Sequence, residues 1–393
     1  MTSTLSLLAL VWLTAAPVAP PPAAPAPTPP VTCSGDLAVR PGRKIYCALD
    51  LGSKSAKLQV VSIEPGRPLS FKDERLCKAT LGFGAKVYDG KTKEKKPLPA
   101  ADIANLVNVI QQFKRLCAAD KGTLVGAEAT QWARDATNMA EVMAAVKAGA
   151  AIDIDVLSTE DEGRYGYTAA TRNLPERFAL DPGSNSFQLG WMEKGSRSPR
   201  TVSVDFGYVR AAAAYYAATS ADSYEVARAK HAADVTARLE AALAAASPPT
   251  SLSALRAAVV AGKLKPQIFL LGQDGALDLA VRATLRGDSA GWIDSKDAYE
   301  KQLAQPRVQV AGAPAGVTAV LTPAEVDAWF SKIVGPADYE ALRSKTVRDL
   351  YGEKALANTV LVDVLVKQLG LTSIALVPQE MPAGYILSKL AKH

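Results

Sequence analysis

Two apolar segments of the chain each end in an aspartate and a turn rich in glycine and serine. Residues 44–51 (KIYCALDL) are followed by the turn GSKS and a second apolar run, which together predict a β-hairpin. Residues 177–192 (RFALDPGSNSFQLGWM) repeat this order. The strings DLGSKSAKL and DPGSNSFQL share their Asp, Gly, two Ser and last Leu, so we interpret them as copies of one duplicated unit.

Strand and helix patterns alternate behind each hairpin. In the first half we expect strands at 67–82, 122–130 and 152–158, and helices at 99–120 and 138–150. In the second half we expect a strand and turn at 200–212, a long Ala-rich helix at 221–246, a strand, turn and helix start at 265–285, mostly helices from 323 to 370, a last strand at 371–378 and a closing helix at 382–393. This alternation predicts an α/β fold built by internal duplication.

The amino-terminal residues predict export. LSLLALVWLTAA is an apolar run of signal-peptide length, too short to span a bilayer comfortably, although no Lys or Arg precedes it. We therefore expect a signal peptide at 1–19, no stable membrane insertion after its removal, and a periplasmic or secreted protein. A Pro/Ala-rich linker at 20–43 should form an extended polyproline-II spacer.

Composition excludes several kinds of chemistry. Only two histidines are present, His231 and His393, which argues against a Ser-His-Asp triad or a His-rich zinc site. The net charge is +6, but Lys and Arg are spread along the chain, so we expect no nucleic-acid partner. No C-x-x-C pair occurs, and in an exported protein one or two disulfides, of open pairing, are expected among Cys33, Cys47, Cys77 and Cys117. Pro30-Val31-Thr32 makes Cys33 a poor lipidation site.

The repeated turn suits phosphate. A tight turn of Gly and Ser exposes backbone N–H groups and brings hydroxyls close without bulky side chains. Two such turns, one from each half, could face each other across a cleft and hold a phosphate chain. The aspartates that open the turns, Asp50 and Asp181, could hold Mg²⁺ through water. The alternative is that both are ordinary hairpin turns.

Six short motifs together carry a family resemblance. In chain order they are DLGSKS (50–55), GAEATQWARDATN (126–138), TEDEGR (159–164), DPGSNS (181–186), GYVR (207–210) and GQDGA (272–276). This order resembles the exopolyphosphatase / guanosine pentaphosphate phosphohydrolase (Ppx/GppA) family of the actin-like ATPase superfamily. The resemblance covers roughly residues 44–393. It implies two duplicated actin-like (ribonuclease H-like) domains, 44–175 and 176–393, around an interdomain cleft, with the last helix returning to the first domain.

The resemblance also implies a role for each matching residue. Glu162 would orient or deprotonate the attacking water, and Arg134 would clamp a phosphate bidentately. Asp50 and Asp181 would carry Mg²⁺. The phosphate cradle would consist of Gly52, Ser53, Lys54, Ser55, Gly183, Ser184, Asn185, Ser186, Arg210, Gly272 and Gly275. The structural alternatives are a solvated acidic loop for Glu162, an ion pair with Asp135 or Glu128 for Arg134, and a purely structural role for Arg210.

Several positions depart from the family pattern. Lys54 replaces an asparagine, and Pro182 in the second turn has no N–H to offer. Only Gly183 remains of three consecutive glycines, and Asp274 stands where a glycine is usual. Two interpretations of Lys54 stay open: it pairs with Asp274 across the cleft when no ligand is bound, or it is itself a phosphate ligand.

The sequence predicts that this protein is an exported phosphohydrolase. The substrates would be polyphosphate-like chains, cleaved at terminal phosphoanhydride bonds by Mg²⁺-assisted attack of water. The alternative is a phosphatase-like protein that has lost turnover and binds polyphosphate or phosphorylated ligands. An actin-like ATP-dependent kinase is disfavoured, because we identify no acceptor-activating Asp. Substrate chain length and oligomeric state, a homodimer included, stay open.

Overall fold

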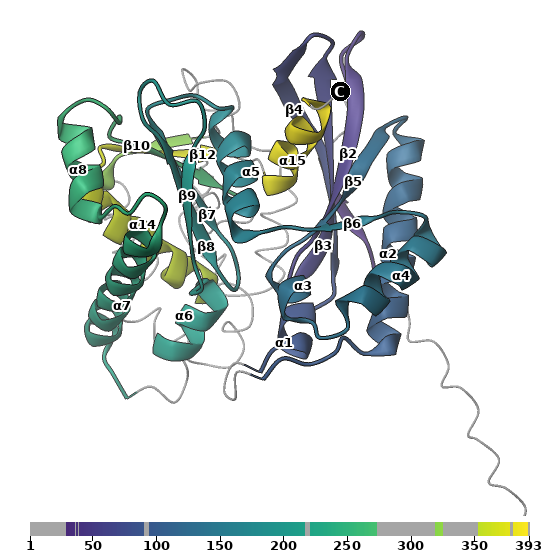
Figure 1. Ribbon diagram of the computed structural model, residues 1–393, viewed down its shortest axis with the longest axis horizontal. Coiled ribbons are helices and arrows are strands. Elements are labelled where there is room, and N and C mark those ends of the chain that lie inside the picture. Colours follow the sequence, from purple (N-terminus) through teal and green to yellow (C-terminus); the bar gives the residue numbers. More distant parts are fainter. Residues whose placement is uncertain are drawn as a thin grey trace, which may run out of the picture.

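The structure consists of two α/β domains that lie side by side (Figure 1). It is a computed structural model that describes residues 29–35, 37, 39–89, 94–216, 221–272, 319–324, 353–377 and 380–391. The predicted signal peptide lies outside the described residues, as do residues 20–28 of the predicted linker. The rest of that linker is not all an extended spacer, because Thr32–Ser34 form a strand that pairs with residues 76–78. Within the described ranges, no helix is long and apolar enough to cross a membrane.

The first domain is built on a sheet with the strand order β1-β4-β3-β2-β5-β6. Its strands are β1 (Thr32–Ser34), β2 (Lys44–Leu51), β3 (Ser55–Glu64), β4 (Arg67–Thr80), β5 (Thr123–Ala129) and β6 (Ile154–Val156). Its helices are α1 (Phe83–Val87), α2 (Ala100–Ala119), α3 (Gln131–Asp135) and α4 (Met139–Ala150). The amphipathic stripe of α2 packs into the core through buried Leu106, Ile110 and Phe113. The expected hairpin, third strand and helices of this half are confirmed.

The second domain repeats this topology. Its sheet has the order β11-β12-β10-β7-β8-β9. The strands are β7 (Arg177–Pro182), β8 (Phe187–Met192), β9 (Arg200–Val204), β10 (Gln267–Leu271), β11 (Ala319–Leu321) and β12 (Ser373–Val377). The helices that follow β9 are α6 (Tyr208–Tyr215), α7 (Tyr224–Ala245), α8 (Leu252–Val260) and α14 (Glu353–Leu369). In both sheets the first hairpin strand is central, antiparallel to its partner on one side and parallel to a later strand on the other, so the duplication is confirmed.

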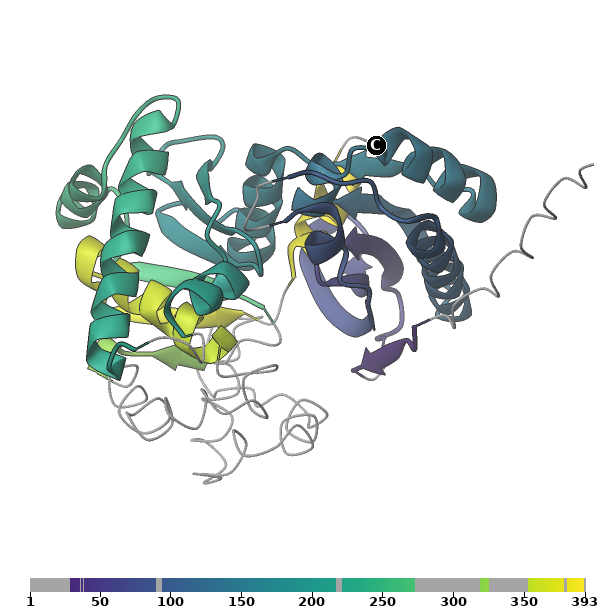
Figure 2. The ribbon, with the colours of Figure 1, turned by 90° about the horizontal axis from the view of Figure 1, so that it is seen from below.

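Two helices cross from one domain to the other. α5 (Thr159–Thr171) follows the first sheet and packs on β7, β8 and β9, whereas α15 (Met381–Leu390) follows the second sheet and packs on β2 and β5. Figure 2 shows α15 between α5 and the first sheet. A Cβ on Gly384 would lie 2.0 Å from the Tyr165 carbonyl oxygen, so the two helices approach as closely as glycine permits. This exchange brings both helix N-termini to the space between the domains.

Two sequence interpretations need correction here. The acidic cluster TEDEGR is not a loop after a strand: it forms the start of α5, with Ser158 as N-cap accepting a hydrogen bond from the Asp161 amide. Carboxylates in the first turn of a helix are favoured by its dipole, which is a local signal that the acidic run carried. The GYVR turn is likewise the start of α6, with Gly207 as N-cap.

Two disulfides join the described cysteines. Cys33–Cys77 ties the edge strand β1 to β4, and Cys47–Cys117 ties the buried strand β2 to α2. Both lie in the first domain, and they settle the pairing that the spacing left open.

Removing the inner disulfide should be the more damaging change. Cys47→Ala/Cys117→Ala opens a loop of sequence separation 70 inside the core, and we expect it to lower the free energy of unfolding by about 2–4 kcal/mol. Cys33→Ala/Cys77→Ala releases only the exposed strand β1 and should cost less. Urea unfolding of the two variants beside the oxidised parent measures both. An equal or larger loss from the outer pair would contradict this ranking.

Candidate functional site

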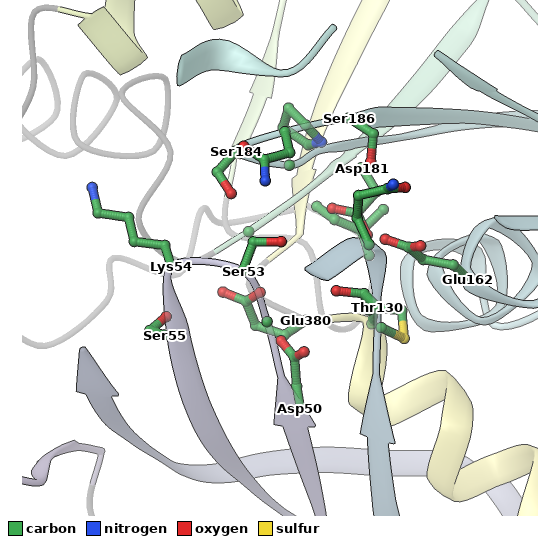
Figure 3. Close-up of a pocket in the computed structure, with 18 of the residues that line it drawn as sticks. Asp50, Ser53, Lys54, Ser55, Thr130, Glu162, Asp181, Ser184, Ser186 and Glu380 are labelled. Carbon is green, nitrogen blue, oxygen red and sulfur yellow. The ribbon is translucent and has the colours of Figure 1, made fainter. Parts of the chain in front are cut away.

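The two repeated turns line one cavity between the domains (Figure 3). Twelve residues expected at the site line it: Asp50, Gly52, Ser53, Lys54, Ser55, Glu162, Asp181, Gly183, Ser184, Asn185, Ser186 and Gly272. Arg134 and Arg210 do not, and Gly275 lies outside the described residues. The internal repeat in the sequence therefore predicts most of the cavity wall.

Each turn has its carbonyl groups bonded away from the cavity. In the first turn, the carbonyl of Lys54 accepts from the amides of Leu81 and Gly82, and that of Ser53 from the amide of Gly84. These donors lie at the start of α1. The first turn therefore presents amides rather than carbonyls to the cavity.

The second turn repeats the arrangement with α6. The amides of Gly207, Tyr208 and Val209 donate to the carbonyls of Asn185, Gly183 and Ser184 in that order. In the described part of the chain, no acceptor is found for the amides of four turn residues: Ser53, Lys54, Ser184 and Asn185. Unpaired amides in a tight turn form a binding site for anions.

Glu162 is held at the cavity by an arginine. It lies in the first turn of α5, 9% exposed, and its Oε2 accepts a hydrogen bond of 3.0 Å from Arg134 Nη2. Arg134 also donates to the Leu157 carbonyl and to Gln131 Oε1, at 2.6 and 2.9 Å. Burial raises the pKa of Glu162, and Arg134 opposes that rise. The guanidinium that the resemblance assigned to phosphate therefore holds the Glu162 carboxylate in this structure; its contact with phosphate stays a prediction.

The alternative ion pairs considered for Arg134 do not form. Asp135 pairs with Lys95 at 3.1 Å. Glu128 is fully buried on β5, and neither of its carboxylate oxygens has a hydrogen-bond partner among the described residues. Burial, together with the neighbouring charge of Asp50, raises the pKa of Glu128 well above its usual value. Both effects disfavour the charged form of Glu128.

Arg210 and Lys54 differ in their relation to the cavity, since only Lys54 lines it. Arg210 pairs with the Asp205 carboxylate, and its guanidinium lies 5.1 Å from the centre of the Tyr88 ring, which favours the structural role. Lys54 lines the cavity, and its side chain points away from Asp50 and Glu162 (Figure 3). Its Nζ lies 5.9 Å from the Tyr208 ring centre in the second domain. Asp274, the other candidate partner, lies outside the described residues.

Two lysines and one glutamate that line the cavity were not predicted from the sequence. Lys57 and Lys78 line it, as does Glu380, the N-cap residue of α15. Lys57 carried a signal, because it is the register partner of Asp50 in the hairpin and so shares its face of the sheet. Glu380 carried none, since only the packing of α15 onto the first sheet brings it there.

The aspartates of the two turns are buried close to other carboxylates. Burial and the carboxylates of Glu380 and Glu162 raise the pKa of Asp181 to about 7. Burial also raises the pKa of Asp50, which Lys57 partly offsets. Carboxylates that raise one another's pKa suit a hydrated divalent cation. No compact cluster of three His, Cys, Asp or Glu is found among the described residues.

The pKa of Asp181 makes the stability of the metal-free protein depend on pH. The folded chain keeps this proton up to about pH 7, whereas the unfolded chain loses it near pH 4, so the free energy of unfolding should fall as pH rises through this window. With EDTA present, we expect a loss on the order of 2 kcal/mol between pH 5 and 8. Asp181→Asn should flatten that slope in urea unfolding, and Asp153→Asn, at an exposed position, should not. Equal slopes in all three proteins would contradict the assignment.

Duplicated α/β domains whose glycine–serine turns line one cavity define an actin-like fold. Residues 77–262 match the model of the Ppx/GppA phosphatase family. Among solved structures, a Ppx/GppA family member from Aquifex aeolicus is 18% identical, with a TM-score of 0.62 over 89% of this chain and 98% of its own. An exopolyphosphatase from Cytophaga hutchinsonii is 14% identical, with a TM-score of 0.61 over 89% and 98%.

One curated protein is similar to part of this chain. Retrograde regulation protein 2 of Saccharomyces cerevisiae is 28% identical over 178 residues, which are 42% of this chain and 29% of that protein. The chain thus spans less than a third of the length of that relative. The expected resemblance to the Ppx/GppA phosphatase family and the two-domain actin-like fold are confirmed.

Proposed function

We propose that this protein is an exported phosphohydrolase that cleaves terminal phosphoanhydride bonds of polyphosphate-like chains by Mg²⁺-assisted attack of water. One observation carries the proposal: two opposed turns offer unpaired amides to the same cavity at whose edge Arg134 fixes Glu162. The first feature binds phosphate and the second can take a proton from water. The similarity to an exopolyphosphatase structure supports the choice of substrate class.

The residues divide the reaction between binding and proton transfer. The turn amides and the hydroxyls of Ser53 and Ser184 would bind the terminal phosphoryl group and spread its charge. Glu162 would orient the attacking water and accept its proton, and its raised pKa brings it closer to the optimum for a general base. Asp50 and Asp181 would hold Mg²⁺, which neutralises charge on the phosphate chain when it is bound.

Two observations support export. The described cysteines form two disulfides, which persist in oxidising compartments. The apolar run at the amino terminus has the length of a signal peptide. Cell fractionation of the tagged full chain tests the compartment.

Phosphate release tests the activity. We expect the purified chain to release inorganic phosphate from long-chain polyphosphate in Mg²⁺ and to stop when EDTA is added. The second candidate, a binding protein without turnover, is favoured by the altered second turn, in which Pro182 cannot donate a hydrogen bond. Tight polyphosphate binding with no phosphate release would establish that candidate. Absence of both binding and release would refute both functions.

A further inference from the structure

An ammonium group lies among the carboxylates at the base of the cavity. Lys57 Nζ is 2.8 Å from Glu380 Oε2 and 3.5 Å from Asp50 Oδ2. The side chains of Lys57, Glu380 and Asp50 are 18%, 13% and 10% exposed, and all three line the cavity. Figure 3 shows Glu380 beside Asp50, below the first turn. The two domains therefore meet at a desolvated ion triad inside the phosphate site.

Backbone geometry fixes all three members of the triad. Asp50 and Lys57 are opposite each other on the antiparallel strands β2 and β3, so their side chains leave the sheet on the same face. Glu380 is the N-cap of α15, which packs on β2 and β5. The ammonium of Lys57 is therefore held between strand β2, which carries Asp50, and helix α15, which carries Glu380.

The Lys57 ammonium lies close to the position that a divalent cation bound to Asp50 would take. Burial raises the pKa of Asp50 and Lys57 opposes that rise, so the ammonium is already the counter-charge of this carboxylate. A divalent cation that binds Asp50 would face a positive charge already within 3.5 Å of Oδ2. Like charges at this separation repel strongly when both are partly buried. The Lys57 ammonium should therefore weaken the binding of a divalent cation to Asp50.

We propose that Lys57 is an internal counter-ion that competes with the divalent cation for Asp50, and that Glu380 holds the ammonium whether or not the cation is bound. This inference rests on the proposed function for its assignment of Asp50 as a cation ligand. It assigns Lys57 and Glu380 as positioning residues: together they keep the acidic turn ordered without metal and lower its affinity for Mg²⁺.

Cation affinity without substrate tests the competition. Calorimetric titration of the full chain with Mg²⁺ alone, and with Mn²⁺ alone, should give a Kd about tenfold lower for Lys57→Met than for wild type. Lys57→Arg keeps the charge and should bind within about twofold of wild type. Lys78→Met removes another lysine that lines the cavity and is the matched control; it should change the Kd by less than Lys57→Met does. Glu380→Gln removes the other carboxylate that holds the Lys57 ammonium, so the ammonium should pair more strongly with Asp50 and the Kd for the cation should rise.

The outcomes separate this inference from the proposed function. If wild type binds Mg²⁺ and releases phosphate but neither Lys57→Met nor Glu380→Gln alters the Kd, the competition is refuted and the hydrolase stands. If Lys57→Met tightens Mg²⁺ binding and wild type releases no phosphate, the competition holds and the hydrolase is refuted. If neither wild type nor any variant binds either cation, the competition is refuted, and phosphate release alone decides the hydrolase. Should Lys57→Met not fold, judged by circular dichroism, Glu380→Gln and Lys57→Arg still decide the matter.

Discussion

Glu162→Gln is expected to lower the rate of phosphate release by about 10²- to 10⁴-fold, the usual contribution of a positioned general base. Glutamine has the same shape, and its Oε1 can still accept the hydrogen bond that Arg134 Nη2 donates at 3.0 Å. It cannot accept a proton from water. Because the turn amides are untouched, polyphosphate should bind with nearly unchanged affinity, so kcat should fall while KM changes little.

The matched control for this variant lies in the same helical turn. Glu160→Gln changes an exposed carboxylate in the first turn of α5, which does not line the cavity, and should leave kcat within about twofold. Initial rates of phosphate release and the Kd for polyphosphate, measured on both variants, give the comparison. Arg134→Lys should lie between them, since an ammonium cannot hold Glu162, Gln131 and the Leu157 carbonyl together. Full turnover in Glu162→Gln would remove Glu162 from the mechanism.

The repeated sequence predicted the cavity wall because each copy determines the structure of its own short segment. Strings of nine residues at 50–58 and 181–189 encode a strand end, a turn and a strand start, and a duplicated fold places such turns symmetrically. The roles of single residues were less predictable. Arg134 matched a family motif, yet its partner Glu162 is 28 residues away, in an acidic run that we did not assign to a helix from the sequence.

The base of the cavity depends on contacts between distant segments. Glu380 is 323 residues from Lys57, and the two meet only because α15 returns to the first sheet. Hydrophobic periodicity predicts that such a helix exists but not which sheet it covers, since an apolar stripe fits either domain. The resemblance implied the returning helix, whereas the ion triad that it brings follows only from the three-dimensional structure.

Gly207→Ala should disable the second turn. The backbone dihedrals of Gly207 suit any residue, but a Cβ there would lie 2.5 Å from the carbonyl oxygens of both Gly183 and Ser184. Backbone cannot yield to such contacts, so α6 must move away from the turn. Its three amide-to-carbonyl hydrogen bonds would then be lost, and the freed carbonyls could face the cavity, where they repel phosphate. We expect polyphosphate affinity and turnover to fall by about 100-fold, as three lost hydrogen bonds of about 1 kcal/mol each imply.

The cost of losing a glycine must be separated from the cost of displacing α6. Gly195→Ala is the control, because Gly195 has positive φ but no atom within 4 Å of the position that a Cβ would take, so only backbone strain changes. It should lower the melting temperature slightly and leave polyphosphate binding intact. Gly207→Ala should lose binding at a temperature where far-UV circular dichroism still shows a folded chain, because the buried residues that α6 gives to the large second-domain core are two alanines, Ala211 and Ala212. Retained binding in a folded Gly207→Ala protein would mean that the anion is held without the second turn, by the first turn and the lysines alone.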